Sequence, residues 1–457
     1  MPVFDFNPAP IASPEPHFVE RAPGPRQDLG VLRFITAGSV DDGKSTLIGR
    51  LLYDSKAVLA DQLSAISRSK NSRVAQGEID LSLLTDGLEA EREQGITIDV
   101  AYRYFATSKR KFIIADTPGH EQYTRNMVTG ASTAHAAIIL VDPTRVENED
   151  DGRLRLLPQT KRHSALVKLL GLRHVIVAIN KMDLIEYSQA RFEAIKSAYL
   201  DLAALLGLSG IQFIPVSALK GDNIVGASDK MPWHSGLPLL SLLESLPVDP
   251  PVGKPLRFPV QWVARQDGAK SDAFRGYMGR VESGKICVGD SISVMPSNQR
   301  ATVARILAPI PGGLAFADRA LAGQAATIQL SEDVDVSRGD IFVHQAAASP
   351  VKRIQADLCW FGDEPLSLKR KYLLKHATQT VFSKIDRVES VLDVRTLFEL
   401  QGDRPFSMND IGRVSLTVQK PLLADLYELL PLTGAFVLID ETTHHTVAAG
   451  MIRALLP

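Results

Sequence analysis

Residues 38–45 read Gly-Ser-Val-Asp-Asp-Gly-Lys-Ser, a complete match to the phosphate-binding pattern G-x-x-x-x-G-K-[ST]. Gly38 and Gly43 allow the tight turn in which successive backbone N–H groups face a phosphate. Lys44 supplies a positive charge for the β- and γ-phosphates, and the Ser45 hydroxyl is a ligand suited to Mg²⁺. An apolar stretch precedes the loop and a helical pattern follows it. This context predicts an α/β nucleotide-binding domain and argues against a chance match in an ordinary turn.

Further motifs follow apolar stretches in a meaningful order. Asp116 begins the segment Asp-Thr-Pro-Gly-His, and it is placed to hold a Mg²⁺-bound water, while Gly119 can offer its N–H to a γ-phosphate. Residues 180–183 read Asn-Lys-Met-Asp. Asp183 can accept two hydrogen bonds, from N1–H and from the 2-amino group of guanine. Adenine lacks this pair of donors, so the motif favours GTP over ATP.

Two more segments complete the predicted site. A backbone N–H within Ser217-Ala218-Leu219 can reach the guanine O6, and Thr97 is a candidate to bind Mg²⁺ and to sense the γ-phosphate. The predicted metal ligands are Ser45, Thr97 and Asp116. The residues predicted to bind GTP are Gly38, Ser39, Val40, Asp41, Asp42, Gly43, Lys44, Ser45, Thr46, Asp116, Gly119, Asn180, Lys181, Asp183, Ser217, Ala218 and Leu219.

Strand-like and helix-like patterns alternate through the first half of the chain, for example in the helical stretch 189–206 that follows an apolar run. Such units predict a mostly parallel sheet with flanking helices and with ligands at the carboxyl ends of the strands. We therefore predict an α/β P-loop GTPase domain at 30–246. A proline-rich linker follows, and then short alternating runs with turn signals, which predict two β-barrel domains at 254–346 and 350–457.

Composition narrows the remaining possibilities. A chain of 457 residues has room for about three domains. The 51 basic and 52 acidic residues nearly balance, so no nucleic-acid partner is expected. Cys287 and Cys359 lie far apart, which predicts reduced thiols in a cytoplasmic protein. Residues 1–29 are proline-rich and lack the apolar core of a signal peptide, so we expect a disordered tail. No apolar run reaches the length of a membrane span.

One segment resembles a second phosphate-binding loop. Residues 279–285 have its spacing, but Ile286 stands where the Mg²⁺-binding hydroxyl belongs, and the flanking patterns are strands. We expect a hairpin turn there. The three tryptophans, Trp233, Trp262 and Trp360, are expected to anchor packing rather than to stack on ligands.

Longer stretches carry a resemblance to a known family. Residues 38–46, 92–105 and 116–127 resemble the translational GTPases, and they are most similar to the GTPase (large) subunit of bacterial sulfate adenylyltransferase, also called ATP sulfurylase. Elongation factors usually have a histidine at the position of Asp42. The resemblance extends from about Leu32 to the last residues and so covers most of the chain.

The resemblance implies a coupled enzyme. GTP hydrolysis on this subunit would drive the uphill synthesis of adenosine 5′-phosphosulfate and pyrophosphate from ATP and sulfate. That reaction would occur on a smaller, ATP-pyrophosphatase-like catalytic subunit. We find neither a second nucleotide site nor a Ser-Gly-Gly-x-Asp-Ser loop in this chain, and we expect no fused adenylylsulfate kinase. The family pattern also gives His120 the role of orienting the attacking water. The candidate catalytic residues are His120, Lys44 and Thr97.

Other functions remain open at this point. An elongation-factor-like carrier of aminoacyl-tRNA would share the fold and the GTP site, although Asp42 and the balanced charge argue against it. A regulatory GTPase switch is a third possibility. Residues 143–158 form a loop that is longer than the family pattern and acidic, then basic. It is either a tolerated surface insertion or an altered contact with the partner.

Overall fold

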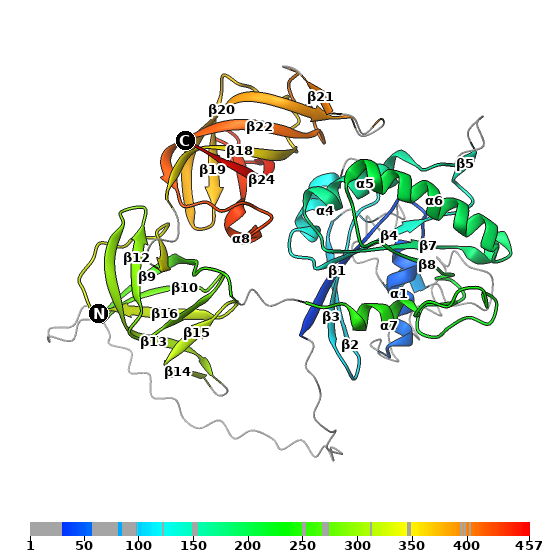
Figure 1. Ribbon diagram of the computed structural model, residues 1–457, viewed down its shortest axis with the longest axis horizontal. Helices are drawn as coiled ribbons and strands as arrows, with labels where there is room; N and C mark the ends of the chain where they lie inside the picture. Colours follow the sequence, from blue (N-terminus) through cyan, green and yellow to red (C-terminus); the bar gives the residue numbers. More distant parts are fainter. Residues whose placement is uncertain are drawn as a thin grey trace, which may run out of the picture.

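The computed structural model describes residues 30–56, 81–84, 97, 99–120, 123–148, 154–248, 253–266, 274–310, 313–344, 349–393, 396, 399–401 and 404–457. The predicted tail, 1–29, lies outside the described residues, as does most of the segment that precedes Thr97. Figure 1 shows one body in which helices flank a sheet and two bodies made mainly of strands.

The first body is built on a six-stranded sheet in the order β2-β3-β1-β4-β7-β8. All neighbouring strands run parallel except β2, which is antiparallel to β3. The strands are β1 (Val31–Ala37), β2 (Ala101–Ala106), β3 (Lys111–Asp116), β4 (Ala136–Val141), β7 (His174–Ile179) and β8 (Gln212–Pro215). The predicted mostly parallel sheet is therefore confirmed.

Strand β4 explains the apolar runs in the sequence. Every residue of β4 is buried, and alternate side chains enter two separate cores. Ile139 lies in the core beneath one face of the sheet, and Ile138 lies in the core beneath the other. A strand that is covered on both faces needs apolar residues at every position, and a period-2 pattern is therefore absent from it.

Helices cover both faces of this sheet (Figure 1). Helices α4, α5 and α6 contribute to one core, and α1 and α7 contribute to the other. The helices are α1 (Lys44–Asp54), α4 (Thr124–Ala131), α5 (Pro158–Leu169), α6 (Gln189–Leu206) and α7 (Leu239–Ser245), with the 3₁₀ helices η1 (Leu81–Leu84) and η3 (Met182–Ile185). No helix among the described residues is both long and apolar enough to cross a membrane.

The second body is a β-barrel. Its strands follow the order β12-β17-β9-β10-β16-β13, and β12 also pairs with β13, so six strands close on themselves. Strand β14 extends the sheet beyond β13, and β11 pairs separately with β15. The strands are β9 (Phe258–Gln266), β10 (Phe274–Arg280), β11 (Lys285–Cys287), β12 (Ser291–Met295), β13 (Gln299–Ile310), β14 (Gly313–Ala317), β15 (Arg319–Leu321), β16 (Ala325–Leu330) and β17 (Ile341–His344).

The third body repeats the same architecture. Six strands in the order β19-β23-β24-β18-β22-β20 close through a pairing of β19 with β20, and β21 extends one edge. The elements are β18 (Val351–Trp360), β19 (Lys371–His376), β20 (Gln379–Leu392), β21 (Glu399–Gln401), β22 (Ile411–Leu422), α8 (Pro431–Gly434), β23 (Ala435–Asp440) and β24 (Thr446–Leu456). Two barrels thus follow the α/β domain, as the sequence predicts.

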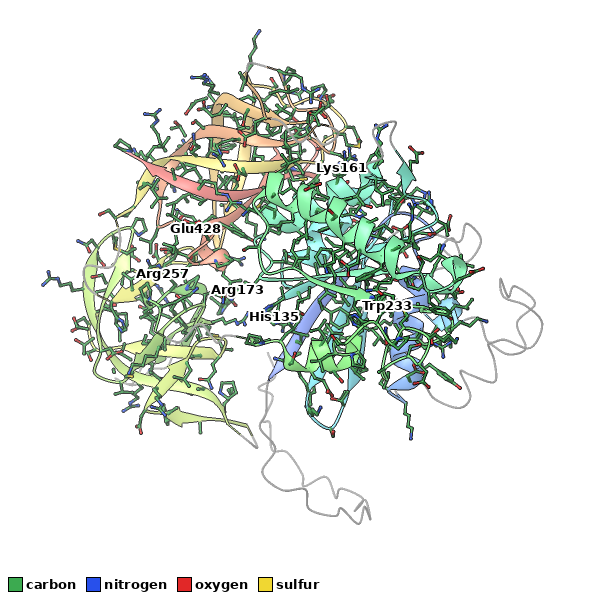
Figure 2. All side chains as sticks on the ribbon, turned by 45° about the vertical axis from the view of Figure 1, so that its right-hand side comes forward. His135, Lys161, Arg173, Trp233, Arg257 and Glu428 are labelled. Carbon is green, nitrogen blue, oxygen red and sulfur yellow. The ribbon has the colours of Figure 1, made fainter. Side chains whose placement is uncertain are left out.

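Specific contacts join the three bodies. The Tyr427 hydroxyl donates to the Leu170 carbonyl at 3.1 Å, and the Arg453 guanidinium donates to the Leu169 carbonyl at 2.8 Å. These contacts attach the third body to the end of α5. The Arg257 guanidinium, which is labelled in Figure 2, donates to both oxygens of Asp425, at 2.9 and 2.8 Å, and so links the two barrels.

Two expectations were wrong in part. The segment 279–285 does join two strands, but β10 pairs with β9 and β16 whereas β11 pairs with β15, so the connection is not a hairpin. Trp360 is buried and Trp233 is partly buried against Phe192, as expected for packing anchors. Trp262, however, is 64% exposed because it lies on the outer face of β9.

The loop after β4 contains structure of its own. Strands β5 (Glu147–Asn148) and β6 (Leu154–Arg155) pair antiparallel within it, and helix α5 follows. The two described ends of the long loop are therefore paired with each other.

Candidate functional site

The loop between β1 and α1 has the conformation that its glycines predict. Gly43 precedes α1 in the left-handed region (φ 91°), and a Cβ there would lie 2.4 Å from Asn180 Nδ2. Gly38 has φ 150°, and its Cβ would lie 2.9 Å from the Leu140 carbonyl oxygen. Neither position accepts a side chain without displacing a neighbour. The two glycines therefore let the loop pass close to β4 and to Asn180.

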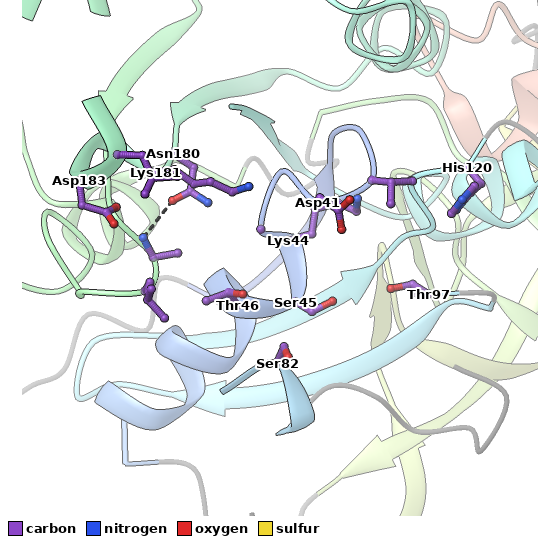
Figure 3. A pocket seen from close by; sticks show the side chains of 16 residues that line it. Asp41, Lys44, Ser45, Thr46, Ser82, Thr97, His120, Asn180, Lys181 and Asp183 are labelled. Atoms are coloured by element: carbon purple, nitrogen blue, oxygen red, sulfur yellow. Dashed lines mark hydrogen bonds between the residues drawn. The ribbon is translucent and has the colours of Figure 1, made fainter. Parts of the chain in front are cut away.

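A cleft of about 370 Å³ opens over this loop, at the carboxyl ends of the strands. Its lining brings together six segments of the chain, and Figure 3 shows the side chains that line it. The lining residues are Val40, Asp41, Gly43, Lys44, Ser45, Thr46, Ser82, Thr97, Gly119, His120, Asn180, Lys181, Asp183, Leu184, Ala218 and Leu219. Its volume lies in the range of small-molecule sites.

Lys44 is the main positive charge beneath the cleft. Its side chain is buried, and Nζ donates to the carbonyl oxygens of Gly38 at 3.1 Å and Ser39 at 2.8 Å. Burial lowers the pKa of the Lys44 ammonium, while the nearby carboxylates of Asp42 and Asp116 oppose that shift. Together with the backbone N–H groups at the start of α1, the lysine makes this end of the cleft suited to an anion.

The opposite end is organised by Asn180. Its Oδ1 accepts the Ala218 N–H at 2.9 Å, which is the dashed line in Figure 3, and its Nδ2 donates to the Asp42 carbonyl at 2.8 Å. One amide therefore joins the end of β7, the loop after β8 and the phosphate loop. The Asp183 carboxylate accepts a hydrogen bond from the Ser217 hydroxyl at 2.6 Å, which orients it beside the cleft.

Hydroxyl groups converge between the two ends. In Figure 3 the hydroxyls of Ser45 and Thr97 point toward each other across the cleft. Asp116 is buried at the end of β3, where the Thr36 hydroxyl donates to its Oδ1 at 3.3 Å. Among the described residues, no group of three or more His, Cys, Asp and Glu side chains could hold a metal ion. A cation here would depend on hydroxyls and on ligand oxygens, which is the mode that Mg²⁺ uses with nucleotides.

His120 stands at the edge of the cleft, and its ring packs edge-to-face against Tyr123 with centroids 6.3 Å apart. Of the predicted residues, Gly38, Ser39, Asp42, Asp116 and Ser217 do not line the cleft. Hydrogen bonds join Gly38, Ser39, Asp42 and Ser217 to residues of the lining, whereas Asp116 is bonded to Thr36.

Three residues of the site were not predicted from the sequence. Ser82 and Leu184 line the cleft without belonging to a recognised motif. His163, on α5, accepts the Gly38 N–H through Nδ1 at 3.0 Å, so the proton of the neutral ring is on Nε2. Burial, together with the positive charges of Lys44 and Arg162, lowers the pKa of His163 to about 3. The ring therefore stays a neutral acceptor. The only sequence signal was its place in the Gln-Thr-Lys-Arg-His-Ser segment.

Comparisons with known proteins agree with this geometry. Residues 30–248 match the elongation factor Tu GTP binding domain, and residues 353–453 match the GTP-eEF1A C-terminal domain-like family. A protein of Saccharophagus degradans named sulfate adenylyltransferase subunit 1 is 48% identical over 93% of this chain and 87% of its own length. The protein of that name from Shewanella woodyi is 47% identical over 93% of this chain and 88% of its own length.

The chain belongs to the sulfate adenylyltransferase subunit 1 family. The bifunctional enzyme NodQ of Rhizobium meliloti is also similar, at 46% identity over 97% of this chain and 67% of NodQ. The solved GTPase-like domain of Ski7 from S. cerevisiae, bound to GTP, shares the fold. Its TM-score is 0.50 at 18% identity, over 93% of this chain and 97% of that one. This member of the subunit 1 family thus carries a GTP-binding domain of the elongation factor Tu type.

Proposed function

We propose that this chain is the GTPase subunit of a sulfate adenylyltransferase. Hydrolysis of GTP in its cleft drives the synthesis of adenosine 5′-phosphosulfate and pyrophosphate from ATP and sulfate on a partner subunit. The observation that carries the proposal is the identity of 48% with a sulfate adenylyltransferase subunit 1, over 93% of this chain. The cleft, which brings Asn180, Asp183 and Ala218 together with the phosphate loop, supports it. The same relatives favour this function over the carriage of aminoacyl-tRNA.

Each residue of the cleft is assigned to the part of GTP that its hydrogen-bonding groups or charge would bind. Asp183 accepts from guanine N1–H and the 2-amino group, and a backbone N–H of the segment Ser217-Ala218-Leu219 reaches O6. Lys44 turns from its two carbonyl partners to the β- and γ-phosphates, and the Gly119 N–H binds the γ-phosphate. Ser45 and Thr97, with Asp116 behind them, would hold Mg²⁺, which when bound neutralises charge on the phosphates.

His120 completes the hydrolytic part of the proposal. It lies beside Gly119 at the mouth of the cleft. A neutral imidazole there can accept a hydrogen bond from the attacking water and orient it toward the γ-phosphate. Lys44 and Thr97 stabilise the negative charge at the same centre.

The partner and the division of the chain are part of the same proposal. The partner is a smaller, ATP-pyrophosphatase-like catalytic subunit, and neither nucleic acid nor a membrane is required. We place the domain boundaries at 30–246, 254–346 and 350–457, with residues 1–29 as a disordered tail, in a cytoplasmic protein.

The decisive experiment separates GTP binding by this chain from the synthesis of adenosine 5′-phosphosulfate on the partner. The isolated chain should bind GTP with Mg²⁺, yet it should form no adenosine 5′-phosphosulfate from ATP and sulfate. After the smaller subunit is added, product should accumulate in step with GTP hydrolysed. Product made by this chain alone, or product made at the same level without GTP, would contradict the proposal.

A further inference from the structure

Arg145 reaches the phosphate loop from the long loop that follows β4. Its Nη1 donates a hydrogen bond to the Val40 carbonyl oxygen and lies 3.9 Å from Asp42 Oδ1. The Arg145 side chain is 41% exposed, whereas the Asp42 side chain is only 1% exposed. A half-exposed guanidinium therefore contacts a buried carboxylate within the nucleotide-binding loop.

The Asp42 carboxylate is a buried acidic group within this loop. Its Oδ2 accepts the Ser39 N–H at 2.5 Å, but its buried Oδ1 has no hydrogen-bond partner among the described residues. Burial raises the pKa of Asp42 to about 6, even though Lys44, the Ser39 N–H and Arg145 each lower it. In its charged form the Asp42 carboxylate lies beside a cleft suited to phosphates. A buried charge is costly unless an opposite charge balances it.

Lys44 cannot balance Asp42 fully once a nucleotide is bound, because its ammonium then faces the phosphates. Arg145, in contrast, is not assigned to any part of the nucleotide. Its hydrogen bond to Val40 also fixes the peptide between Val40 and Asp41, both of which line the cleft.

The backbone around Arg145 is held independently of the Arg145 side chain. The Arg191 guanidinium donates to the Pro143 carbonyl at 2.9 Å and to the Val146 carbonyl at 2.6 Å, on either side of Arg145. Thr144 donates through its backbone N–H to Asp142 Oδ1 at 2.9 Å. Since other groups hold the loop, Arg145 does not need to contact Val40 for the loop to fold. Its side chain is pre-organised toward the phosphate loop.

We propose that Arg145 is a positioning residue of the nucleotide site, which balances the buried Asp42 carboxylate and fixes the Val40 carbonyl so that the loop can accept phosphates. This inference rests on the proposed GTP site. It gives the long loop after β4 a role in nucleotide retention rather than that of a tolerated insertion.

The test is a double-mutant cycle on the full-length chain, read out as the Kd and the dissociation rate of fluorescent GTP and GDP. Arg145→Gln should raise the Kd for GTP at least about tenfold, mainly through faster dissociation. In the Asp42→Asn/Arg145→Gln variant, removal of the carboxylate should restore affinity to within about threefold of wild type, so the two changes should be strongly non-additive. Arg145→Lys, which keeps the charge, should fall between wild type and Arg145→Gln.

Arg155→Gln, an exposed change in the hairpin of the same loop, is the matched control and should leave the Kd unchanged. Thermal unfolding without nucleotide shows whether each variant is folded. If wild type fails to bind GTP, the proposed function itself fails. If wild type binds GTP but Arg145→Gln binds equally well, or the double variant stays as weak as Arg145→Gln, then the role of Arg145 is refuted.

Discussion

Asp183 is the side chain on which base selectivity is predicted to depend. Its hydrogen bond from Ser217 orients the carboxylate beside the cleft. In Asp183→Asn one acceptor becomes a donor, which matches xanthine rather than guanine. We expect GTP affinity to fall by a factor of about a hundred and xanthosine triphosphate to become the better ligand. Titration with both nucleotides checks this, with Asp201→Asn on the exposed side of α6 as the control. An unchanged preference for GTP would remove Asp183 from the base site.

His120 is predicted to serve hydrolysis and not binding. It lies at the mouth of the cleft, packed against Tyr123, and need not touch guanine or the α- and β-phosphates. His120→Ala should leave the Kd for GTP nearly unchanged and slow partner-stimulated hydrolysis at least about a hundredfold. Single-turnover hydrolysis with the partner present is the measurement. His445→Ala, in the exposed turn between β23 and β24, is the control. Hydrolysis at the wild-type rate would mean that His120 only packs.

The phosphate loop could be predicted from the sequence because its requirements are local. A strand, two glycines, a lysine and a helix start occupy consecutive positions, and each has a single physical reason. The strands β4 and β7 could be predicted from their apolar runs for the same reason. The residues that support the phosphate loop could not be predicted, because they come from distant positions in the sequence. His163 meets Gly38 across 125 residues, Arg145 meets Val40 across 105, and Asn180 meets Asp42 across 138.

Strand pairing within the barrels is also a non-local property. The segment 279–285 was correctly placed between strands, but the sequence could not show that β10 and β11 choose different partners. Trp262 was misjudged because an alternating strand pattern does not say which of its two faces is solvated.

The tight approach of the phosphate loop to Asn180 gives a prediction for Gly43. Gly43→Ala places a methyl group 2.4 Å from Asn180 Nδ2 and forces an L-residue to φ 91°. We expect GTP affinity to fall at least about tenfold, because the strain of about 1–2 kcal/mol is joined by displacement of Asn180. Gly210→Ala is a matched control, since φ there is 68° and no atom lies within 4 Å of the new methyl group. Gly210→Ala should lower stability slightly and leave the Kd unchanged. Equal effects on the Kd would show that crowding at Asn180 is irrelevant.

A buried ion pair is one of the contacts that join the two barrels. The Lys254 ammonium also donates to the Leu429 carbonyl, and a small apolar cluster of Met295, Ile341, Val343 and Leu423 spans the joint. Arg257 is 2% exposed and donates to both oxygens of Asp425, whose Oδ2 also accepts the Thr433 hydroxyl at 2.6 Å. The cleft lies entirely in the first body, and no residue of this joint lines it. Because the joint and the cleft share no residue, we expect assembly of the barrels and binding of nucleotide to be separable.

Arg257→Gln should loosen that joint without disturbing the cleft. Removing one partner leaves the Asp425 carboxylate poorly balanced, at a cost of about 3–5 kcal/mol. We expect the calorimetric transition of the barrels to move down by about 5 °C or more and cleavage by a protease between the barrels to accelerate, while the Kd for GTP stays within about twofold of wild type. Arg275→Gln is the matched control, because its partner Asp333 is 93% exposed and such surface pairs add little stability. If Arg257→Gln and Arg275→Gln melt alike, the Arg257–Asp425 pair does not hold the barrels together. If the Kd for GTP rises along with the loss of stability, the barrels and the nucleotide site are coupled, and the expected separation of the two properties is wrong.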